Sequence, residues 1–190
     1  MSLSEEIVAS GKLFELVHET QPDGRVFEKA RRAPGVRLII VDRPKGTILL
    51  TKEFRKELGG WDYRLPGGKV FDSLGEYDAH RQSGAAILEA ATKKAREEAV
   101  EEAGIDTKEL TLFRKSTLGA TVEWDLYVFE VGKWSLSEGG QQLEEGEMIE
   151  AVSWFGYEEV EAMIMRGDMQ EDRIALILLQ WIAKQKESTK

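Results

Sequence analysis

The fold of this 190-residue chain is decided by two stretches of its sequence, Leu65-Pro66-Gly67-Gly68-Lys69-Val70 and Arg96-Glu97-Glu98-Ala99-Val100-Glu101-Glu102-Ala103-Gly104-Ile105. The second stretch closes a helical pattern over residues 85–103, and glycine, here Gly104, commonly follows the last turn of a helix. At about 3.6 residues per turn, the apolar side chains of this helix share one stripe. That stripe contains Ile87, Leu88, Ala91, Ala95, Ala99 and Ala103. We expect Glu98 and Glu102 to lie on or beside this face, which packs inward.

The crowding of charge on this helix leaves two interpretations open. Glu98, Glu101 and Glu102 fall within an arc of about 100°, where carboxylates three or four residues apart repel one another. One interpretation is a solvated charge face, which suits Lys93 and Glu97 because they point away from the apolar stripe. The other is a metal cluster, because a buried charge needs a partner and Glu102 falls among alanines. Carboxylate ligands favour Mg²⁺, Mn²⁺ or Ca²⁺.

The composition excludes several classes of protein. Lys and Arg number 26 against 35 Asp and Glu, a net charge of −9, so the surface repels nucleic acids and we expect no nucleic-acid partner. The absence of cysteine excludes a disulfide framework, a thiolate zinc site and a cysteine nucleophile. The N-terminus lacks signal-peptide features, and no apolar run approaches the roughly 20 residues of a membrane span. We therefore expect a cytoplasmic protein with no membrane partner.

Local patterns predict strands with helices interspersed. Pro22-Asp23-Gly24 is a strong turn signal between two strand-like segments, 13–17 and 25–30, and this arrangement predicts a hairpin. The β-branched run 36–41 predicts a buried strand, with 47–51 as its antiparallel partner. Further strands are expected at 61–65, 69–71, 110–115, 121–131 and 151–155, and further helices at 157–166 and 172–184. The pattern indicates an α/β layered domain with a mixed sheet.

Together, the two quoted stretches resemble the Nudix box, which reads G-x5-E-x7-R-E-U-x-E-E-x-G-U with U aliphatic. The gap of seven residues between Glu89 and Glu97 matches this pattern. Two positions depart from it. The 20 residues 69–88 separate Gly68 from Glu89 where the box has five, an insertion of 15 residues. Glu97 replaces the box arginine, and Arg96 stands one place earlier.

Over residues 7–184 the chain is most similar to the ADP-ribose pyrophosphatase branch of Nudix enzymes. The signs are Arg32-Ala33-Pro34-Gly35-Val36 before the first core strand, Glu53-Phe54-Arg55 after the second, and an acidic loop, 144–149, before Val152-Ser153-Trp154-Phe155. The resemblance implies a Nudix-like α/β/α sandwich with a mixed central sheet. It assigns residues 35–190 to the hydrolase domain and residues 1–34 to an N-terminal β-hairpin extension for dimerisation, so we expect a homodimer.

The resemblance also implies the metal and catalytic residues. Mg²⁺ or Mn²⁺ would be held by Glu98, Glu101, Glu102 and Glu147 against a substrate diphosphate, and a metal-polarised water would attack phosphorus. Glu145 corresponds to the general base proposed for this branch. Glu145 and Glu102 are therefore the expected catalytic residues, and a solvated acidic loop is the alternative for Glu145 and Glu147.

Two arginines are candidates for substrate binding. Arg55 corresponds to a residue that contacts a substrate phosphate, and a surface arginine without this role is the alternative. Arg64 replaces a glutamate that the branch commonly has near its base-binding pocket. Trp61, Tyr63 and Trp124 are candidates for stacking on a base, although such aromatics more often belong to the core.

The expected function is that of a Mg²⁺-dependent pyrophosphohydrolase acting on a nucleoside diphosphate sugar such as ADP-ribose. A hydrolase of nucleoside triphosphates or other nucleotides is the alternative within the same fold. A non-catalytic Nudix domain that binds a nucleotide-sugar is the alternative from another class, favoured by Glu97 at the box arginine and by the insertion. For the polar insertion itself, residues 71–84, a lid, an oligomer contact and an idle loop are the alternatives.

Overall fold

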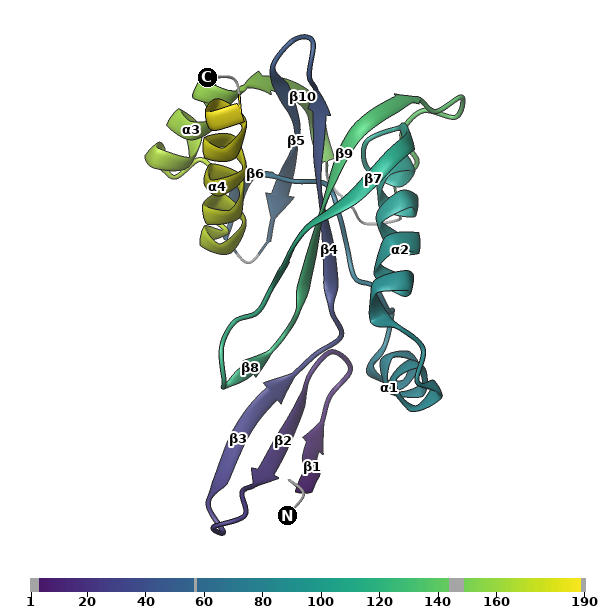
Figure 1. Cartoon of the computed structure of the whole chain (residues 1–190), viewed down its shortest axis with the longest axis vertical. Coiled ribbons are helices and arrows are strands. Elements are labelled where there is room, and N and C mark those ends of the chain that lie inside the picture. Colours follow the sequence, from purple (N-terminus) through teal and green to yellow (C-terminus); the bar gives the residue numbers. More distant parts are fainter. Residues whose placement is uncertain (1–3, 57, 144–148, 189–190) are drawn as a thin grey trace.

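A mixed six-stranded sheet forms the centre of the computed structural model, which describes residues 4–56, 58–143 and 149–188 (Figure 1). Its strands are β4 (Gly35–Asp42), β5 (Thr47–Arg55), β6 (Gly60–Arg64), β7 (Ile105–Ser116), β9 (Leu126–Leu136) and β10 (Ile149–Gly156). They run in the order β10-β5-β4-β9-β7, with β6 paired to β5. β4 and β9 are parallel, and the other pairs are antiparallel. The helices are α1 (Leu74–Ser83), α2 (Ile87–Glu101), α3 (Tyr157–Arg166) and α4 (Asp172–Ser188).

β4 contributes to both hydrophobic cores, because successive side chains of a strand face opposite sides of a sheet. Val36, Leu38 and Ile40 pack in one core with the alanines of α2. Ile39 and Val41 pack in the other core with side chains of α3 and α4. Figure 1 shows α2 on one side of the sheet and α3 and α4 on the other. The expected α/β/α sandwich is confirmed.

The helices begin and end close to the predicted positions. The bounds of α3 are those predicted, and α4 ends at Ser188 rather than at residue 184. After α2, Gly104 adopts a φ of 64°, and its N–H donates to the carbonyl of Val100 at 3.0 Å. This left-handed residue closes the helix as the sequence predicts. In the described part of the chain, no helix is both long and apolar enough to cross a membrane.

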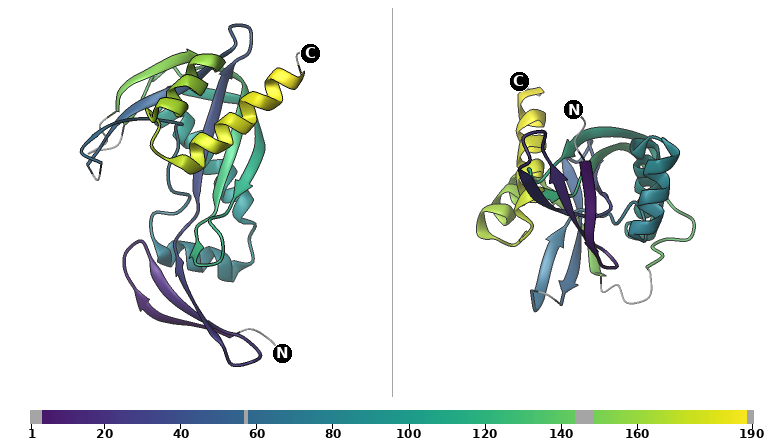
Figure 2. Two further views of the ribbon diagram at one scale, coloured as in Figure 1. Left: turned by 90° about the vertical axis from the view of Figure 1, so that its left-hand side faces the viewer. Right: turned by 90° about the horizontal axis from the view of Figure 1, so that it is seen from below.

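A second, four-stranded sheet lies at one end of the molecule (Figures 1 and 2). Its strands are β1 (Ser4–Ser10), β2 (Glu15–Thr20), β3 (Val26–Arg31) and β8 (Val122–Glu123). The predicted hairpin is confirmed as the antiparallel pair β2–β3. The prediction missed β1, because all seven of its residues are exposed and no buried face gives it an apolar pattern. The single strand predicted over 121–131 is wrong: it is divided into β8, which pairs with β3, and β9.

Arg31, on β3, links that strand to the other three strands of the second sheet. Its side chain is only 3% exposed, and it donates to Glu5 on β1 at 2.6 Å and to Glu15 on β2 at 3.1 Å. Its Nε donates to Glu123 on β8 at 2.9 Å. Because β8 leads into β9, this network fastens the N-terminal strands to the central domain.

The insertion in the Nudix box contains a helix. Ser73 caps the N-terminus of α1, where its Oγ accepts the N–H of Glu76 at 3.2 Å, and Gly84 ends the helix with a φ of 73°. Leu74 and Tyr77 are its buried side chains. Because only these two apolar side chains anchor an otherwise polar segment, the sequence shows no apolar stripe with helical spacing. The segment is therefore an ordered, capped unit rather than an irregular loop.

We expect Arg31→Met to lower the free energy of unfolding by about 3 kcal/mol, because it leaves the buried carboxylate of Glu15 without its partner. Arg25→Met is the matched control, since Arg25 pairs with Asp23 at an exposed turn and such pairs contribute about 0–1 kcal/mol. Urea titration followed by circular dichroism at one fixed protein concentration measures both. Equal losses in the two variants would contradict the anchoring role.

Candidate functional site

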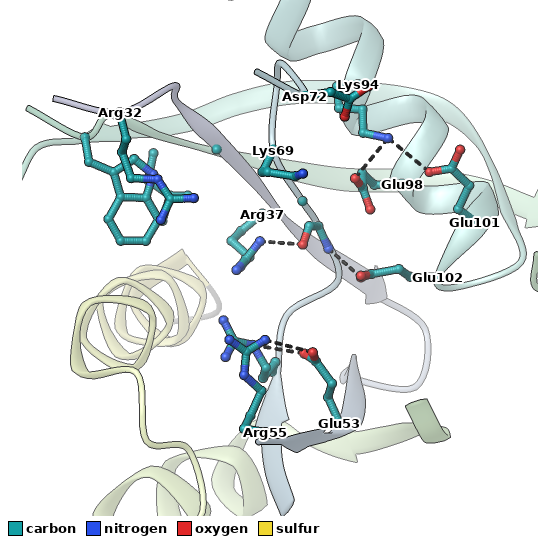
Figure 3. A pocket seen from close by; sticks show the side chains of 16 residues that line it. Arg32, Arg37, Glu53, Arg55, Lys69, Asp72, Lys94, Glu98, Glu101 and Glu102 are labelled. Carbon is teal, nitrogen blue, oxygen red and sulfur yellow. Dashed lines mark hydrogen bonds and ion pairs between the residues drawn. The ribbon is translucent and has the colours of Figure 1, made fainter. Parts of the chain in front are cut away.

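A pocket of about 340 Å³ opens between the C-terminal end of α2 and the neighbouring strands (Figure 3). Glu98, Glu101 and Glu102 lie along its α2 side, and all three predicted metal ligands of this helix therefore line one site. Arg55 and Arg64, from β5 and β6, also line it. The structure thus brings together five of the predicted site residues. The other two, Glu145 and Glu147, lie outside the described residues.

Two glycines allow the glutamates to approach the loop after β6. A Cβ on Gly68 would lie 2.1 Å from Oε1 of Glu98, so a larger residue there would force this carboxylate to move. Gly67 has a φ of 140°, and a Cβ there would lie 2.3 Å from the carbonyl oxygen of Val36. The N–H of Gly67 donates to Oε2 of Glu102 at 2.6 Å. The glycine pair therefore leaves space for Glu98 and binds Glu102.

Lys94 lies between the other pair of carboxylates. Its Nζ is 3.1 Å from Oε1 of Glu98 and 3.2 Å from Oε2 of Glu101. Burial raises the pKa of the Glu98 carboxyl, and the ammonium of Lys94 opposes part of that shift. Burial also disfavours the charge of Lys94, but the two glutamates outweigh it and raise the pKa of the ammonium. Among the described residues, no three acidic or histidine side chains converge in a metal-binding arrangement.

The position of these glutamates on α2 is itself electrostatically unfavourable. Helix C-termini carry a partial negative charge and favour cations, yet the last turn of α2 holds no basic residue. Glu98 is 5% exposed, so water screens it little. Such a cluster requires cations close by, and Lys94 supplies one from an earlier turn of the same helix.

The two predicted substrate-binding arginines are ion-paired. Arg55 contacts Glu53 at 2.8 Å, and Arg64 contacts Glu171 at 2.6 Å and Glu53 at 3.5 Å. Arg64, which replaces a glutamate of the related branch, is thereby held by acidic residues from β5 and from the segment before α4. Both guanidinium groups remain at the pocket wall.

Sequence reasoning missed Arg37, a largely buried cation of the site. Its side chain is 12% exposed and donates to the carbonyl oxygens of Val36 and Gly67, while its Nε has no hydrogen-bond partner. Burial and the nearby charge of Arg64 lower the pKa of this guanidinium. A signal was present, because Arg37 is the one charged residue inside the apolar run 36–41.

Aromatic and cationic groups form the far side of the pocket. The guanidiniums of Arg32 and Arg173 pack on the ring of Trp124, at 4.3 and 4.7 Å from its centroid. Trp124 therefore lines the pocket but already stacks on side chains of the protein. Of the other base-stacking candidates, Tyr63 packs edge-on against Phe155 beside the core.

The departures from the Nudix box have separate local explanations. Arg96 donates to Oγ1 of Thr107 on β7 at 2.7 Å and does not line the pocket. Glu97 lies 3.6 Å from Lys93 on the outer face of α2. Glu89 is exposed on the same helix. No described arginine of α2 therefore takes the place of the box arginine beside the glutamates.

Comparison with known proteins identifies the family. The sequence model of the NUDIX domain matches residues 31–177. A solved structure described as "Crystal structure of ADP compounds hydrolase" has a similar fold, with a TM-score of 0.64 and 16% sequence identity over 97% of this chain and 95% of that one. No curated protein matches the chain. The chain belongs to the Nudix family, its expected assignment to the Nudix hydrolases is confirmed, and its fold is similar to that of the ADP compounds hydrolase.

We expect Gly67→Ala to cost at least about 2 kcal/mol of stability, because it combines backbone strain with a clash against Val36. Gly75→Ala is the control, since Gly75 lies in α1 with no close neighbour and alanine favours a helix. Chemical denaturation of both variants provides the comparison. A Gly67→Ala protein as stable as the wild type would show that this close approach is not required.

Proposed function

We propose that this protein is a Mg²⁺- or Mn²⁺-dependent pyrophosphohydrolase that cleaves the diphosphate of a nucleoside diphosphate sugar such as ADP-ribose. The observation that carries the proposal is the distribution of charge in one pocket. Carboxylates from α2 face guanidinium and ammonium groups from the strands and loops across it. A divalent cation on the first side and a diphosphate on the second would satisfy both sets of charges.

The donor chemistry on α2 fits a hard divalent cation, although the three side chains do not converge on one point in this structure. Glu98, Glu101 and Glu102 offer oxygen ligands, which Mg²⁺ and Mn²⁺ prefer, and the Lys94 ammonium already stands as a cation between two of them. A bound divalent ion supplies charge neutralisation of the diphosphate and lowers the pKa of a coordinated water. Glu102, held by the N–H of Gly67, would keep its carboxylate oriented toward that ion.

The cations opposite α2 are suited to the substrate phosphates. Within the described residues, neither Arg32 nor Lys69 is ion-paired, and the carboxylate paired with Arg37, that of Glu171, lies 3.9 Å away. Arg37 also has an unused Nε donor. Guanidinium groups bind phosphate oxygens in a fixed geometry, so Arg32 and Arg37 would orient the diphosphate with the help of the Lys69 ammonium. Arg55 would contact a phosphate from β5.

The general base and a further metal ligand rest on family resemblance. Glu145 is proposed to accept the proton of the attacking water, and Glu147 to complete the metal site from the acidic loop before β10. Both residues lie outside the described part of the chain. We also propose a cytoplasmic location, in keeping with the sequence.

One alternative has specific support. Glu97 stands where the box arginine is expected, and Lys94 neutralises two metal ligands, so a Nudix domain that binds a nucleotide-sugar without cleaving it is the second candidate. A panel of nucleoside di- and triphosphate compounds, incubated with Mg²⁺ and analysed for phosphate-containing products, distinguishes the two. It also tests the nucleoside triphosphate hydrolase alternative.

We expect Glu102→Gln to lower turnover at least about a hundredfold on the best substrate, a loss on the order of 3 kcal/mol of transition-state stabilisation. The amide keeps the shape of the side chain and an oxygen for Gly67, so the fold should persist. Glu145→Gln should lower turnover while sparing metal affinity. Glu97→Gln, on the outer face of α2, is the control. Full activity in Glu102→Gln would refute the metal mechanism.

A homodimer assembled through the N-terminal strands is also proposed. Apolar side chains of this region are between 37% and 52% exposed: Ile7, Val8, Leu13, Phe14, Leu16, Val26 and Phe27. The strand register places Ile7 and Phe27 on one face of the second sheet. Ile7 pairs with Val17 and Phe27 pairs with Glu19, and Val17 and Glu19 are two residues apart on β2, so their side chains point to the same face. Clustered exposed apolar groups are typical of interaction surfaces.

We expect the protein to sediment as a dimer at micromolar concentration and the double variant Ile7→Ser/Phe27→Ser to sediment as a monomer. The loss of two apolar contacts on each subunit removes hydrophobic association energy. Met165→Ser provides a control, because Met165 is 79% exposed on α3, away from the N-terminal strands. A monomeric wild type would rule out this assembly.

A further inference from the structure

The ammonium of Lys94 lies between the carboxylates of Glu98 and Glu101, two of the proposed metal ligands. Lys94 lies on α2 one turn before Glu98 and two turns before Glu101, and its ammonium contacts an oxygen of each at 3.1 and 3.2 Å (Figure 3). Its side chain is 19% exposed, so the aliphatic part is largely packed while the ammonium faces the pocket. This spacing makes the contacts a property of the helix itself rather than of a distant loop.

A divalent ion and this ammonium compete for the same oxygens. Mg²⁺ is bound at about 2.0–2.1 Å from its oxygen ligands and requires their lone pairs in a near-octahedral arrangement. The ammonium directs its hydrogens at those lone pairs. It also repels a second cation placed within a few ångströms, and little solvent screens the pair because Glu98 is buried.

We propose that Lys94 is a built-in counter-ion that holds Glu98 and Glu101 in the metal-free protein and must turn away before these carboxylates can serve as ligands of a divalent ion. The inference rests on the proposed metal site. It makes Lys94 a positioning residue: it keeps the two carboxylates together and lowers the affinity of the free protein for metal. The long, flexible side chain allows the ammonium to move within the pocket without moving α2.

The neighbouring lysine provides a matched comparison. Lys93 lies on the same helix, is 81% exposed and sits 3.6 Å from Glu97, a residue that does not line the pocket. Lys93→Met and Lys94→Met therefore remove the same charge from adjacent positions. Only Lys94→Met removes a cation from between the proposed ligands.

Calorimetric titration of the full chain with Mn²⁺, without nucleotide, tests the proposal. We expect Lys94→Met to bind Mn²⁺ at least about tenfold more tightly than the wild type, and Lys93→Met to match the wild type. Lys94→Arg, which keeps the charge, should bind no more tightly than the wild type. In the absence of metal, Lys94→Met should melt at a lower temperature, and saturating Mn²⁺ should raise its melting temperature more than that of the wild type.

Equal or weaker Mn²⁺ binding by Lys94→Met would overturn the inference, as would an equal gain in Lys93→Met. If Lys94→Met does not fold, Lys94→Gln replaces it with the same expectation, because it too removes the charge. The titration is independent of hydrolysis. If the protein binds Mn²⁺ as expected but shows no detectable turnover, the proposed activity is overturned and the inference about Lys94 stands. If the wild type and Lys94→Met are both active and bind Mn²⁺ equally well, the inference is overturned and the proposed activity stands.

Discussion

The crowding of carboxylates at the negative end of α2 is the constraint on which this structure depends. A helix C-terminus disfavours anions, and burial of Glu98 beside the loop removes the screening that water provides. The arrangement persists because three features compensate. The glycine pair gives Glu98 room and donates a hydrogen bond to Glu102, Lys94 neutralises two carboxylates, and cations of the strands face them across the pocket.

Elements with a buried face were predictable from the sequence. The run 36–41 reads as a strand because both of its faces are buried, and α3 has its predicted bounds because local pattern and a terminal glycine agree there. β1 and α1 were not predictable in the same way. β1 is fully exposed and is held by Arg31 from another strand, while α1 is a polar helix fixed by caps and two buried side chains.

The candidate site was predictable where a single helix supplies it. Helical spacing places Glu98, Glu101 and Glu102 on one edge, and the same spacing would have placed Lys94 beside them. Arg37 was not predictable as a site residue, because its role depends on the loop of Gly67 passing beside β4, a contact between segments distant in sequence. The partners of Arg64 likewise come from β5 and from the segment before α4.

The insertion between Gly68 and α2 shows where a chain with this fold can change in length. Closing a loop of 20 residues in place of five is two doublings of length, at about 0.6 kcal/mol of entropy each. Burial of Leu74 and Tyr77, which are 6% and 9% exposed, returns roughly 1.5–3 kcal/mol per large side chain and offsets this loss. Burial of these two side chains therefore outweighs the entropy of closing the longer loop. Since the approach of Glu98 to Gly68 is fixed by packing and not by chain length, this loop can gain or lose whole secondary-structure elements while the α2 side of the pocket keeps its geometry.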